Sequence, residues 1–128
     1  MTEPSLAAAL RASAVGFYPF EAACELLITT CWPPRGDFAP FITAAVSISD
    51  GITPMAAVDW ASAVSALDAG ILPCSGAERR LLRLAASLGD GVPVDLQDAV
   101  TGLDKANITR VTTAIRHAAG HRRPGHTC

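Results

Sequence analysis

Proline and glycine divide this 128-residue chain into segments of roughly helical length, and this division constrains the fold more than any other feature. Proline interrupts regular structure because it lacks an amide hydrogen, and glycine because it loses the most backbone freedom on folding. The segments between them repeat apolar residues at helical spacing, and almost none alternates apolar with polar residues as a half-buried strand does. We therefore predict an all-α fold, a compact bundle of about six or seven short helices.

The predicted helices begin at residues that typically cap them. These are Asp37, Thr53 followed by Pro54, Ser75 with Glu78 in a capping box, Asp95, and Asp104. Gly120 suits a left-handed conformation after the last helix. We expect helices over residues 4–15, 19–31, 38–49, 75–88, 96–102 and 105–119, and one more that begins at Thr53 and Pro54.

Most of these helices carry one apolar stripe that we expect to be buried. The stripes comprise Phe20, Cys24, Leu27, Ile28 and Cys31; Phe38, Phe41, Ile42, Ala45 and Val46; Trp60, Val64, Leu67 and Ile71; Leu81, Leu84, Ala85 and Leu88; and Ile108, Val111, Ile115 and Ala118. Hydrophobic residues make up 50% of the chain, so one sizeable core can form. We expect a single domain over residues 1–120 and a mobile tail over 121–128.

The cysteines and the hydropathy pattern point to the cytoplasm. Cys24, Cys31, Cys74 and Cys128 show neither a C-x-x-C pair nor regular spacing, so we expect reduced thiols rather than disulfides or zinc. The N-terminus lacks the basic region of a signal peptide, and no apolar run is long enough for a membrane span. We predict no membrane association.

The C-terminal third resembles a helix-turn-helix DNA-binding unit. Over residues 76–119 the pattern predicts a helix, a break, a short helix, a sharp turn and a longer helix. The segment GLDKANITRV (102–111) matches the entry into such a second helix, with a cap, a buried apolar residue and a Thr-Arg pair. The side chains that would face DNA or a protein partner are Lys105, Asn107, Thr109, Arg110 and Thr113.

The match departs from that pattern before the turn. Positions that are usually apolar and alanine carry Thr101 and Asp98, and the apolar set Leu96, Ala99, Val100 and Leu103 favours a helix that continues through Gly102. The alternative interpretation is a helical hairpin whose polar face is only solvated. DNA binding therefore stays the second hypothesis.

Basic residues gather in the second half of the chain. Residues 1–74 hold two Lys and Arg against seven Asp and Glu, whereas residues 75–128 hold eight against five, which gives the overall net charge of −2. Arg79, Arg80 and Arg83 form a candidate basic face on one helix. The other interpretation is that these arginines solvate the surface and cover apolar neighbours with their stems.

Neither metal nor cofactor binding is predicted. His117 and His121 have the i, i+4 spacing of helical metal ligands, but Gly120 lies between them and should end the helix. No phosphate-binding or dinucleotide-binding glycine motif is present. We expect no cofactor and no metal.

No catalytic residues are assigned either. Cys24 and Cys31 share an apolar stripe, which indicates inert core thiols, and Cys74 lies before a helix N-terminus where a thiol pKa could fall. An enzyme using Cys74 or the scattered carboxylates is therefore the third hypothesis. The RGD tripeptide at 35–37 is explained by Asp37 as a cap.

The segment LPCSGAERRLLRLAASLGDGVPVDLQDAVTGLDKANITRVTTAIRHAAGHR, with AVDWASAVSALDAG before it, resembles a family of small helical proteins from high-GC Gram-positive bacteria. The resemblance extends over residues 17–122. It implies a cytosolic bacterial protein that folds as an independent domain, and it implies no activity.

Together these patterns favour a non-enzymatic helical domain that acts by protein–protein interaction, with another protein or with itself as partner. DNA binding through the helix 105–119 is the alternative.

Overall fold

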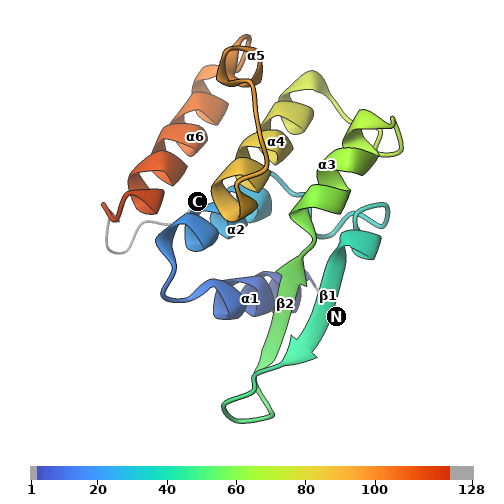
Figure 1. Ribbon diagram of the computed structural model, residues 1–128, viewed down its shortest axis with the longest axis vertical. Helices are drawn as coiled ribbons and strands as arrows, with labels where there is room; N and C mark the ends of the chain where they lie inside the picture. Colours follow the sequence, from blue (N-terminus) through green and yellow to red (C-terminus); the bar gives the residue numbers. More distant parts are fainter. Residues whose placement is uncertain (1–2, 122–128) are drawn as a thin grey trace.

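The computed structural model describes residues 3–121 and shows helices around one core, with a small β-hairpin at one end (Figure 1). The helices are α1 (Glu3–Ala14), α2 (Tyr18–Thr29), α3 (Trp60–Asp68), α4 (Gly76–Asp90), α5 (Leu96–Val100) and α6 (Lys105–Ala118), and a 3₁₀ turn, η1, spans Ala39–Phe41. The strands are β1 (Ile42–Val46) and β2 (Pro54–Val58). Of the expected tail over 121–128, residues 122–128 lie outside the described residues.

Helix α2 is the centre of the core. It packs most extensively against α4 and α6, while α3 packs on α4 and α1 packs on both β2 and α2. The largest fully buried side chains come from α1, α2, α4 and the segment between α2 and β1, and they are Trp32, Phe38, Leu10, Leu27, Leu82 and Cys24. This burial supports the predicted compact helical fold, and within residues 3–121 no helix is long and apolar enough to cross a membrane.

The prediction of a purely α-helical chain is wrong between residues 38 and 59. The expected helix over 38–49 is replaced by η1 and β1, and the expected helix start at Thr53 is replaced by β2, which begins at Pro54. The β-branched residues Ile42, Thr43 and Val46 favour extended backbone, and Asp50 builds the turn between the strands. The helical spacing of the apolar residues therefore led to a wrong prediction here, because a short apolar run fits either a helix or a strand.

Asp50 organises that turn through its carboxylate. Its oxygens accept hydrogen bonds from the backbone amides of Ile52 and Thr53, at 2.8 and 2.9 Å, and from the Thr53 hydroxyl. These bonds to the ionised carboxylate lower the pKa of Asp50 to about 2. Thr53 thus closes a hairpin turn rather than capping a helix.

Two predicted caps, Asp37 and Thr53, do not cap a helix. Asp37 caps no helix, because only the 3₁₀ turn η1 follows it, and its carboxylate pairs with Arg35 at 2.8 Å. Helix α3 instead begins after Asp59, whose carboxylate accepts a hydrogen bond from the amide of Ser62.

The remaining predicted caps are confirmed. Ser75 and Glu78 form the capping box of α4, with both reciprocal hydrogen bonds present. Asp95 caps α5 and Asp104 caps α6. Gly120, with φ 95°, follows α6 in the left-handed region, and its amide donates to the carbonyl of His117.

Cys31 is not a core thiol. It lies just after α2 with φ 63°, and its side chain is exposed. The amide of Cys31 donates to Ile28 and the amide of Trp32 donates to Leu27, which is the hydrogen-bond pattern that usually places glycine at this position.

The buried face of α6 is rotated from the predicted one. Val111 and Ala114 are buried, whereas Ile108 and Ile115 are 37% and 51% exposed. Ile71 is exposed as well, because it lies beyond the end of α3. Gly102 has φ 83° and ends the α5 region, so the expected helix through Gly102 does not form.

Candidate protein-interaction surface

The two strands pair antiparallel, and their register decides which backbone groups remain free. Ile42 lies opposite Val58, Ala44 opposite Ala56, and Val46 opposite Pro54. Asp59 donates its amide to the carbonyl of Phe41 at 2.8 Å, and Ser47 donates to Thr53 at 2.9 Å. Hydrogen-bonded pairs alternate along an antiparallel ladder.

That alternation directs the bonding groups of β1 to two sides. Thr43 and Ala45 fall on hydrogen-bonded positions toward β2, so the amides and carbonyls of Ile42, Ala44 and Val46 point to the opposite edge. The pairing of Val46 with Pro54 agrees with this assignment, since proline has no amide to donate.

The outer edge of β2 is closed by α1. The hydroxyl of Ser13 donates to the carbonyl of Ala56 at 2.6 Å. Pro54 removes an amide donor from the same edge, and α1 packs against the strand (Figure 1). This edge cannot accept another strand without displacing α1.

The outer edge of β1 is open. Thr43, Ala44, Ala45 and Val46 are all exposed, and β1 packs extensively only against β2 within residues 3–121. At the start of the strand, the Ile42 amide is used inside the chain, where it donates to the carbonyl of Ala39. Ala44 and Val46 therefore present the backbone groups that an added strand can bond.

The tip of the hairpin adds exposed apolar side chains to this edge. Ile48 is 104% exposed and Ile52 is 79% exposed, and Val46 lies next to them at the end of β1. The hairpin extends away from the helices at one end of the molecule, opposite α5 (Figure 1). Isolated exposed apolar residues are common, but three on one projecting arm form a candidate contact site.

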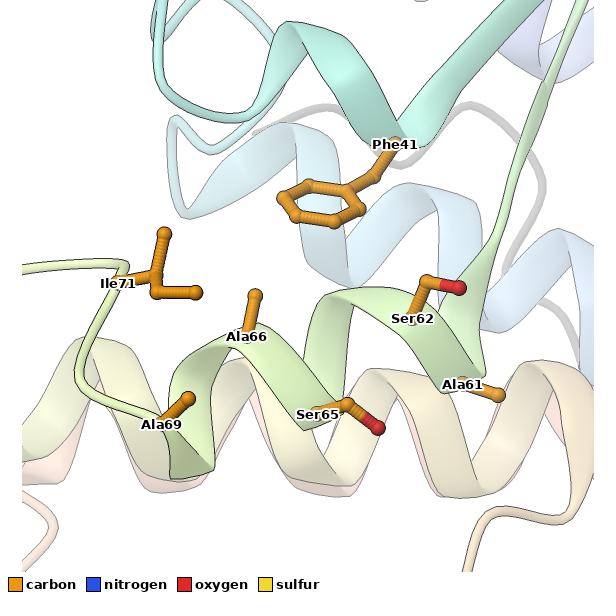
Figure 2. A pocket seen from close by; sticks show the side chains of 7 residues that line it. All are labelled: Phe41, Ala61, Ser62, Ser65, Ala66, Ala69 and Ile71. Atoms are coloured by element: carbon orange, nitrogen blue, oxygen red, sulfur yellow. The ribbon is translucent and has the colours of Figure 1, made fainter.

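A shallow groove lies at the other end of β1. Phe41 packs over one face of α3, and the groove of about 510 Å³ between them is lined by Phe41, Ala61, Ser62, Ser65, Ala66, Ala69 and Ile71 (Figure 2). The lining contains no charged side chain. Since Phe41 directly precedes β1, the groove and the open edge are adjacent.

Charge is almost absent from this part of the chain. There is no lysine or arginine between Arg35 and Arg79, and Asp50 is the one charged residue between Asp37 and Asp59. Proteins commonly protect an open edge strand with lysine, proline or a covering element. The β1 edge has none of these protections within the described structure.

The predicted contact residues of α6 do not share one face. Lys105, Thr109, Arg110 and Thr113 are exposed, but Asn107 is half-buried, and its side-chain oxygen accepts a hydrogen bond from Arg110 at 2.7 Å. The Thr109 hydroxyl donates back to the carbonyl of Lys105. Asn107 and Arg110, two of the five predicted contact residues, thus bind each other within the helix.

The candidate basic face serves partly as internal structure. Arg80 donates to the carbonyl of Asp98 at 3.2 Å and joins α4 to α5, while Arg83 pairs with Asp68 and joins α4 to α3. Arg79 is exposed. Within the described residues the face therefore offers less free positive charge than the sequence indicates.

The remaining candidate chemistry is weakly supported. Cys74 is half-buried, and burial raises the pKa of its thiol, with Glu78 adding to the effect, which is opposite to the activation of a nucleophile. Cys24 is buried and its pKa rises to about 12. Residues 3–121 contain no group of histidine, cysteine and carboxylate side chains that could hold a metal.

His117 has a structural partner that the sequence did not indicate. Its Nε2 lies 2.7 Å from Oε1 of Glu21, and this contact joins α6 to α2. His121 follows the end of α6, so the i, i+4 pair is not presented by one helix.

Sequence reasoning missed the open edge because it assigned helix to residues 38–49. The signal that could have found it is the segment ITAAVSISDGIT, in which β-branched residues precede an Asp-Gly turn. Comparison with known protein families, with curated proteins and with solved structures gives no match.

Proposed function

We propose that this protein is a non-enzymatic binding module that pairs with an extended polypeptide segment through the open edge of β1. The observation that carries the proposal is the contrast between the two edges of the hairpin. Ser13, Pro54 and α1 close the β2 edge, whereas Ala44 and Val46 leave the β1 edge open. Strand addition to such an edge is a common way of recognising peptides.

The chemistry of the surface defines the kind of partner. Backbone bonds from Ala44 and Val46 give affinity for any extended chain, and the uncharged edge, tip and groove favour apolar or small side chains on it. A highly charged segment would lose hydration without gaining an ion pair.

A proline substitution tests this proposal without breaking the hairpin. The Ala44 amide points away from β2, so Ala44→Pro removes an outward donor and leaves the internal ladder intact. Ala44→Thr keeps the amide and favours extended backbone. We expect peptides selected from a displayed library by the wild-type protein to bind A44T with similar affinity and A44P at least about tenfold more weakly.

The two variants must retain the wild-type circular dichroism spectrum. The proposal is overturned if the wild type is monomeric and no selected peptide binds A44P more weakly than it binds the wild type.

DNA binding through α6 is the second candidate function. It is supported by the order of α4, α5 and α6 and by the exposure of Lys105, Arg110 and Arg116. Lys105→Glu combined with Arg110→Glu is expected to abolish salt-dependent retention on duplex DNA while preserving helical circular dichroism. No retention of the wild type at low salt removes this candidate.

We further propose a bacterial cytoplasmic location. Cys24, Cys31 and Cys74 are free thiols, which fits a reducing compartment. The resemblance to proteins of high-GC Gram-positive bacteria supports the same location.

A further inference from the structure

We infer that the segment that pairs with β1 is β1 of a second copy of this chain, which would give a two-fold symmetric dimer centred on Ala44. This inference rests on the proposed function and names its partner. In the dimer the two hairpins would form one continuous four-stranded antiparallel sheet in the order β2, β1, β1 of the partner, β2 of the partner.

The sequence of β1 is suited to pairing with itself. An antiparallel two-fold arrangement about Ala44 places Ile42 opposite Val46 of the second copy and Thr43 opposite Ala45. Each β-branched residue at an end of the strand then meets another β-branched residue, and the small Ala44 lies at the axis. Such cross-strand pairs stabilise antiparallel sheets.

The backbone groups also match. Ala44 presents its amide and carbonyl outward, so the two copies of Ala44 form a hydrogen-bonded pair. The Val46 amide of each copy can donate to the Ile42 carbonyl of the other. The Ile42 amide already donates to Ala39 and cannot donate to the second copy. The two β1 strands therefore share about four backbone hydrogen bonds, and none forms beyond Ile42.

Strand pairing alone covers too little surface for a stable dimer. Stable interfaces bury about 800 Å² on each partner, more than a five-residue edge can provide. The same register extends the contact, because residues that follow Val46 in one copy lie beside residues that precede Ile42 in the other. The exposed tip with Ile48 and Ile52 would thus lie next to η1 and Phe41 of the second copy.

In this position the exposed hairpin tip of each copy can contact the groove between Phe41 and α3 of the other copy. The groove between Phe41 and α3 is uncharged and open, and the tip carries the most exposed isoleucine of the described chain. A two-fold axis supplies each groove with one tip. The two contacts would then be equivalent, as a closed dimer requires.

Charge does not oppose this arrangement. Across a two-fold axis a charge at the centre faces its own copy, and β1 carries none. The carboxylate of Asp50 at the tip is turned into its own loop by three hydrogen bonds. None of the acidic residues between Arg35 and Arg79 lies in β1, so no like-charge pair forms at the axis.

Sedimentation equilibrium of the full chain between about 5 µM and about 1 mM tests the inference. The wild type is expected to dimerise in this range, and A44P is expected to raise the dimer dissociation constant at least about tenfold. A44T is the matched control and is expected to dimerise as the wild type does.

A charge-swap pair tests the register independently of proline. Ala44→Lys and Ala44→Glu should each be monomeric, because like charges meet at the axis, and an equal mixture of the two should form a heterodimer. If the mixture stays monomeric, or if wild-type dimers are unaffected by A44P, the two-fold arrangement about Ala44 is wrong. Circular dichroism establishes that each variant is folded.

The outcome also separates this inference from the proposed function. A wild type that stays monomeric up to about 1 mM, yet binds peptides in a manner sensitive to A44P, overturns self-pairing and leaves strand binding intact. A dimer sensitive to A44P, A44K and A44E supports both. A monomer that binds no peptide overturns both.

Discussion

The hydroxyl of Ser13 in α1 donates a hydrogen bond to the carbonyl oxygen of Ala56 in β2 over 2.6 Å, and this contact holds the helix against one edge of the hairpin. The side chain is half-buried, so its removal leaves the Ala56 carbonyl without this donor. We expect Ser13→Ala to lower the free energy of unfolding by about 1–2 kcal/mol.

Urea unfolding followed by circular dichroism measures this change. Ser65→Ala is the control, because Ser65 is exposed on α3 and alanine is a better helix former. Equal stabilities of S13A and the wild type would show that the contact contributes nothing.

Gly89 lets α4 approach the indole of Trp60. A Cβ atom at position 89 would lie 2.9 Å from the Trp60 ring and 3.0 Å from Ala23 Cβ, and both neighbours are buried. Although alanine is the better helix former by about 1 kcal/mol, we expect Gly89→Ala to destabilise the protein by about 1–3 kcal/mol through overpacking.

Gly76→Ala in the same helix is the matched control. There the nearest neighbour is the flexible end of Arg80, at 3.3 Å, so we expect unchanged or slightly higher stability. Thermal and urea unfolding compare the two variants. A G89A protein as stable as G76A would contradict the close packing of α4 on Trp60.

Cys31 occupies a left-handed conformation that favours glycine. Its φ is 63°, and its exposed side chain makes little packing contribution. Cys31→Gly is expected to raise the free energy of unfolding by about 0.5–1 kcal/mol because it relieves that strain, partly offset by the greater freedom of glycine in the unfolded chain. Cys31→Ala keeps the strain and should leave stability nearly unchanged, so equal effects of the two substitutions would point to the thiol instead.

Glu78 makes stability depend on acid pH. Hydrogen bonds from Ser75 lower the pKa of Glu78 in the folded protein, and Arg35 adds to the effect. A lowered folded pKa contributes stability above the unfolded pKa, and this contribution is lost as the pH falls through the folded pKa. We therefore expect Glu78→Gln to be less stable than the wild type at neutral pH, with the difference shrinking below about pH 4.5.

Urea unfolding at several pH values tests this dependence. Ser75→Ala removes the other half of the capping box. We expect this variant, like E78Q, to show a smaller difference than the wild type between its free energies of unfolding at neutral and at acid pH. If the free energies of unfolding of the wild type and E78Q differ by the same amount from neutral to acid pH, Glu78 does not cause the pH dependence.

Hydrogen exchange should distinguish alternate amides of β1. In dilute solution, we expect the amides of Thr43 and Ala45 to exchange slowly, because they face β2, and those of Ala44 and Val46 to exchange rapidly. At high concentration Ala44 and Val46 should become protected if the strands self-pair. NMR detects each amide separately, and uniform exchange along β1 at low concentration would contradict the register.

Much of the helical framework could be predicted because its signals are local. The capping box at Ser75 and Glu78, the caps at Asp95 and Asp104, and the Gly120 end of α6 each depend on residues close in sequence. The contact that closes the β2 edge joins Ser13 to Ala56, which are 43 residues apart, so no local pattern predicts it.

The candidate contact residues also divide into features that the local sequence predicts and features that depend on tertiary packing. Exposure of Lys105 and Arg110 followed from the helical period, but the half-burial of Asn107 depends on how α6 packs on α2 and α4. The roles of Arg80 and Arg83 depend on Asp98 and Asp68, which the fold brings to α4 from other elements.

The sequence by itself determined the caps, the breaks and the helices of the C-terminal half, because capping and proline or glycine effects act over a few residues. The β-branched residues and the Asp-Gly turn of residues 42–58 are local signals for a hairpin, but the spacing of the apolar residues fits a helix as well, and the packing of α1 against β2 favours the hairpin. Only the tertiary structure decided which edge of that hairpin is open, because α1 covers β2 and leaves β1 exposed.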